Sequence, residues 1–261
     1  MSETIIEIKN LSTGYRLKKE EKVVARGLNA ALNIGEMTCL LGPNGAGKST
    51  LLRTLAAFQP SLGGDIFVMG QPLKSYKPND LARFISVVLT DNSDIKNITA
   101  WEVVAMGRSP YTGFWGKLTE KDKKIVDKCL GWVGIEHLAQ RKMQTLSDGE
   151  RQKVMIAKAI AQDTDIIVLD EPTAFLDYPN KVGMLILLHK IAKTMNKAVL
   201  LSTHDMEHAL QVADQIWLLD KSLGLTAGTP STLSEDGNIE RYFTAEGMEY
   251  DHKTMTFRIR K

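Results

Sequence analysis

The sequence predicts an α/β fold with a parallel sheet, a small antiparallel sheet beside it and an inserted helical segment. Three observations support this prediction. A glycine-rich loop at residues 42–49 stands between a short apolar run and a helical segment. Apolar and polar residues alternate over much of the first 34 positions, as in half-buried strands. Two apolar runs, at 166–169 and 198–203, are each followed by charged side chains, as parallel strands with functional ends would be.

The amino-acid composition limits the classes of function that this protein can have. With 261 residues and 43% hydrophobic content, the chain can bury a large core. Its 33 basic and 31 acidic residues are mixed, which gives no electrostatic case for nucleic-acid binding. The N-terminal residues lack a secretory pattern, and no apolar run approaches the roughly 20 residues of a membrane span. Cys39 and Cys129 suit a reducing compartment and packing roles. We therefore expect a cytosolic, soluble chain, for which any membrane role must come through a partner.

The first strands are expected at Ile6–Ile8 and Leu28–Ile34, followed by a turn at Gly63–Asp65 and a strand at Ile66–Met69. They predict an antiparallel sheet that flanks the glycine-rich loop. Tyr15 is expected between the first two strands. It is either an aromatic that stacks on adenine or an exposed loop tyrosine.

The glycine-rich loop fits the pattern G-x-x-x-x-G-K-[ST] at every fixed position, with the residues Gly42, Pro43, Asn44, Gly45, Ala46, Gly47, Lys48 and Ser49. Backbone N–H groups of such a loop surround a triphosphate, because glycine turns where a Cβ would collide with phosphate oxygens. Lys48 is expected to reach the β- and γ-phosphates, and Ser49 to hold Mg²⁺. A strand at Met37–Leu41 precedes the loop. The helix from Thr50 follows, with its positive end towards the phosphates.

Near residue 90 the sequence pattern changes from one typical of strands to one typical of helices. Thr99 and Glu102 form a capping box that opens a helix at Ala100–Met106, and Thr119 begins another helix. The loop between them, residues 107–116, is rich in Gly, Pro and aromatics. It forms either a docking surface or a loop packed on its own helices. We predict one nucleotide-binding domain over 1–261, with a catalytic core at 1–89 and 160–261 and a helical subdomain at 90–159.

The segment Leu146–Gln152 begins a long helix. Ser147 and Glu150 form a capping box, which gives a structural reason for the pattern. It does not explain Gly149, because glycine in a helix costs about 1 kcal/mol relative to alanine. A helix start without side chains is what an approaching phosphate requires.

The apolar strand at Ile166–Leu169 ends in Asp170 and Glu171. An acid at the carboxyl end of a parallel strand can reach the Mg²⁺ shell, which is the role expected of Asp170. Glu171 is expected to polarise the attacking water. The strand at Ala198–Thr203 ends at His204, which is expected to contact the γ-phosphate or hold the water and Glu171 in line. His204 and His208 lack a third metal ligand, so no metal site is expected from them.

With these parts in this order, the chain resembles the ATP-binding subunits of ABC transporters. Residues 42–49 match Walker A, 146–150 the LSGGQ signature, and 166–170 Walker B, with Glu171 as the catalytic glutamate. Ala174–Asp177 match the D-loop, His204 the switch histidine, and Tyr15 the aromatic that stacks on adenine. The resemblance implies a P-loop (RecA-like) core, and a homodimer in which the Ser147 and Gly149 of each copy cap the ATP held by the other. The D-loop Asp177 is expected at the same composite site.

Two motifs, the signature and the Q-loop, depart from the family pattern. Asp148 stands where the signature has a glycine, and Glu150 replaces the final Gln. Thr90 stands where the Q-loop glutamine is expected, and its hydroxyl reaches less far towards Mg²⁺ or water.

The stretch Val104–Tyr111 looks like one in ATPases of iron–siderophore, haem and cobalamin importers. The resemblance then implies a motor that binds ATP and Mg²⁺ at the cytoplasmic face of the cell (inner) membrane. Its implied partners are permease subunits and, indirectly, a ligand-binding protein. The alternatives are a soluble ABC ATPase that acts as a clamp or scaffold, as in iron–sulfur assembly, and a nucleotide sensor that does not hydrolyse.

Overall fold

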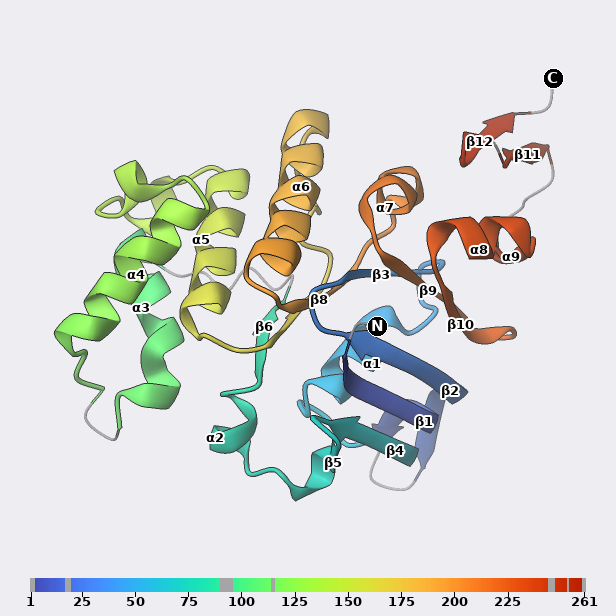
Figure 1. The fold of residues 1–261 in the computed structure, drawn as a ribbon, viewed down its shortest axis with the longest axis horizontal. Coiled ribbons are helices and arrows are strands. Elements are labelled where there is room, and N and C mark those ends of the chain that lie inside the picture. The colour runs from blue at the N-terminus through green and yellow to red at the C-terminus, as the bar shows by residue number, and fades with distance from the viewer. Residues whose placement is uncertain are drawn as a thin grey trace.

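A mostly parallel six-stranded sheet runs through the centre of the molecule in the computed structural model, which describes residues 3–16, 20–89, 96–113, 116–243, 247–252 and 254–259 (Figure 1). Five neighbouring strands pair in parallel, and the edge strand β10 pairs antiparallel to β9. Across the sheet the order is β10 (Gly224–Gly228), β9 (Gln215–Asp220), β3 (Met37–Leu41), β8 (Ala198–Ser202), β7 (Ile166–Leu169) and β6 (Ile85–Val88).

This sheet separates two hydrophobic cores. On β7, Ile167 and Leu169 pack into one core, whereas Ile166 and Val168 pack into the other. The alternation follows from the two-residue period of a strand. Because both faces are covered, the strands read as continuous apolar runs, as the sequence predicted.

The antiparallel sheet covers one side of the phosphate-binding segment. Its strands in order are β2 (Glu21–Asn33), β1 (Thr4–Arg16), β4 (Gly63–Val68) and β5 (Gln71–Pro72). Tyr15 was expected between the first two strands. It lies instead within β1, opposite Lys22 of β2. The two strands run further than the alternation indicated, because their pairing continues through several register shifts.

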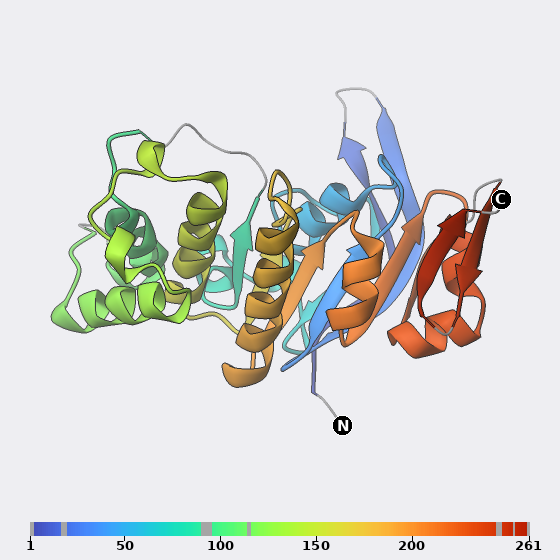
Figure 2. The ribbon, with the colours of Figure 1, turned by 90° about the horizontal axis from the view of Figure 1, so that it is seen from above.

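The helical segment lies at one end of the molecule (Figure 2). Its α-helices pack on one another, and 3₁₀ turns occupy Met106–Tyr111, Glu136–Leu138 and Met143–Thr145. The helices are α3 (Ala100–Ala105), α4 (Glu120–Trp132) and α5 (Asp148–Ala161). The capping boxes predicted at Thr99 and Ser147 are present, and Thr119 begins α4 with a third. The subdomain boundaries at residues 89 and 160 stay a prediction.

The remaining helices connect or cover the sheets. Besides a 3₁₀ turn at Leu73–Ser75, they are α1 (Lys48–Leu55), α2 (Pro78–Leu81), α6 (Tyr178–Thr194), α7 (Met206–Val212), α8 (Pro230–Glu235) and α9 (Asn238–Phe243). The last described strand is β12 (Thr256–Ile259). It pairs with β11 (Met248–Asp251) in a separate two-stranded sheet. Within the described residues, no helix has the length and hydrophobicity to cross a membrane.

Tyr111 packs on the helical segment. Its hydroxyl donates to the Gln162 carbonyl at 3.1 Å, and the Arg108 guanidinium lies 4.1 Å from its ring centre. These contacts favour the second alternative for this aromatic, a loop packed on its own helices. Phe114 and Trp115 of the same loop lie outside the described residues.

A buried ion pair joins this loop to α4 and α5. Arg108 Nε donates to Asp122 Oδ1 at 3.0 Å, and Arg108 Nη1 donates to the Ala161 carbonyl at 2.7 Å. Asp122 also caps α4 by accepting from Thr119. The hydrogen bonds from Thr119, followed by the Arg108 interaction, lower the pKa of Asp122 from 3.8 to about 2.

We expect Asp122→Ala to destabilise the protein by about 2–4 kcal/mol at pH 7, because it removes a helix cap and leaves a buried guanidinium without its carboxylate. Since the folded pKa is about 2 against an ordinary 3.8, the Asp122 contribution is present above the ordinary value. It is lost as the pH falls through the folded value. Urea unfolding at pH values from 7 down to about 2 measures the difference between the two proteins.

Glu120→Ala, which removes a mostly exposed partner of Lys123 from the same helix, is the matched control and should change stability little. Equal losses in the two variants would contradict the assigned role of the buried pair.

Candidate nucleotide site

The phosphate loop connects β3 to α1, and close packing requires two of its glycines. A Cβ on Gly42 would lie 2.1 Å from the Leu219 carbonyl oxygen. Gly47 has φ 107°, and a Cβ there would lie 2.6 Å from Val24 Cγ1. Gly47 precedes α1 without a side-chain cap, so the first N–H groups of the helix are left for an incoming anion.

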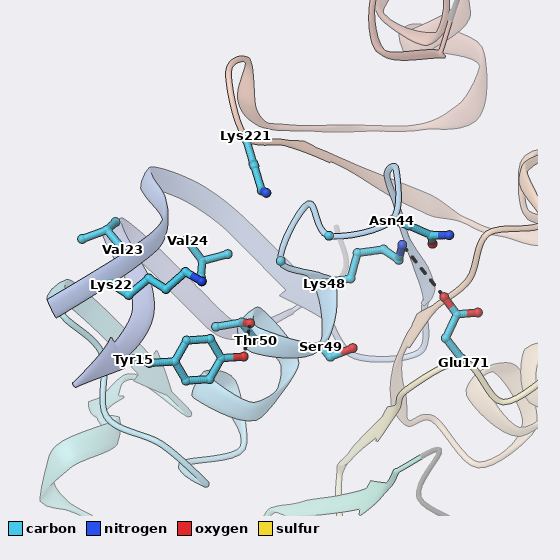
Figure 3. Close-up of a pocket in the computed structure, with 12 residues that line it drawn as sticks. Tyr15, Lys22, Val23, Val24, Asn44, Lys48, Ser49, Thr50, Glu171 and Lys221 are labelled. Atoms are coloured by element: carbon cyan, nitrogen blue, oxygen red, sulfur yellow. Dashed lines mark hydrogen bonds and ion pairs between the residues drawn. The ribbon is translucent and has the colours of Figure 1, made fainter. Parts of the chain in front are cut away.

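Lys48 is buried at the centre of this loop. Its Nζ donates to the Gly42 carbonyl at 2.8 Å and lies 3.9 Å from Glu171 Oε1 (Figure 3). Burial lowers the pKa of Lys48, while the carboxylates of Glu171 and Asp170 oppose that shift. The loop therefore holds a desolvated cation that donates to neutral carbonyls, and charged phosphate oxygens would be stronger acceptors than these carbonyls.

Ser49, Asp170 and Ser202 meet beside the loop. Asp170 Oδ1 accepts from Ser49 Oγ at 3.1 Å and from Ser202 Oγ at 2.7 Å. A serine hydroxyl and a carboxylate oxygen are hard ligands that fit Mg²⁺, which takes few protein ligands and completes its shell with phosphates and water. The described residues contain no cluster of three or more His, Cys, Asp or Glu side chains that would hold a metal on its own.

Ser202 is a site residue that the sequence analysis missed. Its hydroxyl accepts from the Glu171 backbone N–H at 2.9 Å and donates to Asp170, so it contacts both adjacent acids. The only sequence signal for Ser202 was its place, as a hydroxyl side chain, near the end of the apolar run that precedes His204. Its role depends on the strand order, because β8 lies between β3 and β7.

Glu171 and His204 form a pair at the same edge of the sheet. His204 Nδ1 and Glu171 Oε2 share a hydrogen bond of 2.9 Å. Glu171 adopts φ 49°, a left-handed conformation that is uncommon for a residue other than glycine and concentrates at functional sites. The second histidine considered with them, His208, bonds instead to Asp205 at 2.6 Å.

A cavity of about 470 Å³ extends from Glu171 along the loop to Tyr15 (Figure 3). The Tyr15 and Thr50 hydroxyls lie 2.9 Å apart, which fixes the ring at the end of the cavity away from Glu171. The remaining wall consists of residues that the sequence analysis did not single out: Lys22, Val23, Val24 and Lys221. They come from β2 and from the turn after β9, two segments without a local motif.

Among the described residues, those of the signature and the D-loop do not line this cavity. Ser147 caps α5, and Asp177 caps α6 by accepting from the Asn180 N–H at 3.3 Å. A Cβ on Gly149 would have Leu176 Cδ2 as its nearest described neighbour, at 3.6 Å. Packing within one chain therefore leaves room for alanine at Gly149 and does not account for the glycine.

Thr90 lies outside the described residues, so its predicted place near Mg²⁺ stays a prediction. The structure brings together Lys48, Ser49, Asp170, Glu171 and His204, with Tyr15 and Thr50 at the far end of the cavity.

Comparison with known sequences agrees with this geometry. The family model described as ABC transporter matches residues 25–174. An uncharacterised ABC transporter ATP-binding protein of Methanocaldococcus jannaschii is 38% identical over 98% of this chain and 87% of its own length. The ferric enterobactin transport ATP-binding protein of Escherichia coli is 31% identical over 96% of this chain and 92% of its own.

Two solved structures share the fold. A metal-chelate type ABC transporter in an inward-facing conformation superposes with TM-score 0.79 and 30% identity, covering 98% of this chain and 96% of its own. A dimeric ATP-binding cassette in a post-hydrolysis state with ADP and phosphate gives TM-score 0.72 and 26% identity, covering 83% of this chain and 95% of its own. Fold, site and sequence agree: the chain belongs to the ABC transporter family, as an ATP-binding subunit and an ATPase of the kind that this family couples to transport.

Proposed function

We propose that this ATPase is the motor subunit of an importer for iron–siderophore, haem or cobalamin-type ligands. In this proposal ATP closes a homodimer, hydrolysis opens it, and the helical segment moves a membrane permease at the cytoplasmic face. The observation that carries the proposal is that Lys48, Ser49 and Glu171 line one cavity, with Asp170 hydrogen-bonded to Ser49 and His204 hydrogen-bonded to Glu171.

The roles follow from the contacts. Lys48, released from the Gly42 carbonyl, would neutralise β- and γ-phosphate charge. Ser49 and Asp170 would hold Mg²⁺, which supplies further charge neutralisation when bound. Glu171 would take the proton from the attacking water, and His204 would orient its carboxylate through the 2.9 Å hydrogen bond. Positioning and charge neutralisation are the main requirements of this reaction, and little covalent chemistry is left to the protein.

A second copy would complete the site. Ser147, Gly149 and Asp177 lie outside the cavity of their own chain, and Gly149 has room for a Cβ that it does not carry. Close to Asp177, Phe175 is 78% exposed and has a left-handed backbone at φ 65°. An exposed apolar side chain beside the start of α6 is consistent with a face that another molecule covers. The dimeric cassette with ADP and phosphate supports this reading by similarity.

The importer assignment is supported by the ferric enterobactin relative and by the metal-chelate type transporter, which covers nearly the whole chain. The comparisons do not favour the soluble scaffold that was considered as an alternative, because the family model and both relatives are described as ABC transporter or transport proteins.

We expect Glu171→Gln to lower ATP turnover by about 100-fold or more, because the amide cannot accept the water proton. ATP binding should be retained, since Lys48 and the loop are unchanged. Steady-state phosphate release and equilibrium ATP binding measure the two effects. Glu207→Gln, on exposed α7 surface, is the control with the same chemical change and should hydrolyse ATP normally. Normal turnover by the Glu171 variant would remove the proton-acceptor role.

Gly149→Ala should lower ATPase activity by about ten-fold or more and leave the monomer folded. Alanine favours the helix by about 1 kcal/mol, and the nearest described atom is 3.6 Å from its Cβ. Any loss then arises at a surface that a second molecule approaches. Thermal unfolding and ATPase assays test this, with Gly183→Ala in α6 as a matched helical control that has open space around it. Full activity of the Gly149 variant would contradict the composite site.

A pull-down from detergent-solubilised membranes tests the partner. We expect a multi-span permease to copurify with the chain, and ⁵⁵Fe–siderophore uptake to cease in cells that carry the Glu171→Gln variant. Recovery of soluble iron–sulfur assembly proteins in place of a permease would support the scaffold alternative.

A further inference from the structure

The start of α5 carries an unusual charge arrangement. Asp148 and Glu150 are the first and third residues of the helix, and Arg151 follows directly. A carboxylate in the first turn stabilises a helix through its dipole. The same carboxylate repels a triphosphate that approaches along the helix axis, and this repulsion is strong where water is excluded.

The two acids are not equivalent. Glu150 Oε2 accepts from both the Ser147 N–H, at 2.8 Å, and the Ser147 hydroxyl, at 3.0 Å. The backbone hydrogen bond from Ser147 is the main cause that lowers the pKa of Glu150. This carboxylate is held by the capping box. Asp148 takes no part in the box, and its side chain is 57% exposed.

Arg151 is the cation that contacts Asp148. Its Nη1 lies 3.2 Å from Asp148 Oδ1, and its Nε donates to the Met143 carbonyl at 3.2 Å. The second contact fixes the planar guanidinium while the first holds it against the carboxylate. An ordinary exposed ion pair has no such anchor and contributes little.

We propose that Arg151 is a positioning residue for ATP-driven dimerisation: by neutralising Asp148 it allows the start of α5 to approach the triphosphate bound by a second copy. The inference rests on the proposed function, because it takes the composite dimer as given. Asp148 stands where the family signature has a glycine, and the inference assigns to Arg151 the role of compensating for the charge of that replacement.

The test is a double-mutant cycle in the Glu171→Gln background, with Mg²⁺ and ATP and the dimer fraction measured by sedimentation velocity. Arg151→Gln should weaken dimerisation about ten-fold or more, the scale of one charge-assisted contact. Asp148→Gly alone should not weaken it. The double variant should recover to within about three-fold of Asp148→Gly, since the repelling carboxylate is then absent.

Two further measurements separate charge from helix structure. Raising NaCl should reduce the defect of Arg151→Gln, because screening weakens the repulsion. Arg151→Lys keeps the charge but loses the Nε contact to Met143, so its dimerisation should fall between that of Arg151→Gln and that of the protein with Arg151. Lys123→Gln removes the cation of the i, i+3 pair at the start of α4 and is the matched control. Equilibrium binding of ATP to the monomer should be the same in all variants.

The outcomes are distinct. If Glu171→Gln with the natural signature stays monomeric with ATP, the proposed function fails and the inference fails with it. If that protein dimerises but Arg151→Gln matches it, the inference alone is overturned. The inference is also overturned if the double variant is as weak as Arg151→Gln, because Arg151 would then act on something other than Asp148.

Discussion

The hydrogen bonds of Ser202 connect the ends of two neighbouring strands, and the site depends on this connection. Its hydroxyl donates to Asp170 and accepts from the Glu171 N–H, while β3 lies on the other side of β8. Because parallel strands end at the same edge, the phosphate loop, the two acids and His204 meet there. Ser49 and Asp170, 121 positions apart, come within 3.1 Å.

The strand ends are held under conformational constraint. Glu171 and Phe175 both adopt left-handed backbones within one short connection between β7 and α6. Such conformations persist where the surrounding structure determines them. Here Ser202 holds the Glu171 backbone and His204 holds its carboxylate. The acid proposed to accept the water proton is therefore positioned from both of its ends before any nucleotide arrives, which limits reorganisation during reaction.

One chain supplies only part of the proposed composite ATP site. Its cavity runs from Tyr15 to Glu171, while the start of α5 and Asp177 lie elsewhere on the described surface. Packing within the monomer does not account for Gly149 at the start of α5. In the proposed dimer, the start of α5 becomes the surface that senses whether the other copy holds a triphosphate, and binding is thereby coupled to closure.

The sequence by itself determined what short-range chemistry controls. The phosphate loop, the capping boxes at Thr99 and Ser147, and the buried strands were all predicted, because each depends on residues a few positions apart. The order of those strands, the double role of Ser202, the place of Tyr15 within β1, and the Arg108–Asp122 pair were decided by the tertiary structure. The Ser202 contacts depend on which strands become neighbours, and Lys22, Val24 and Lys221 enter the cavity wall only through packing. These contacts join elements with no local signal of their proximity, so only the folded chain brings them together.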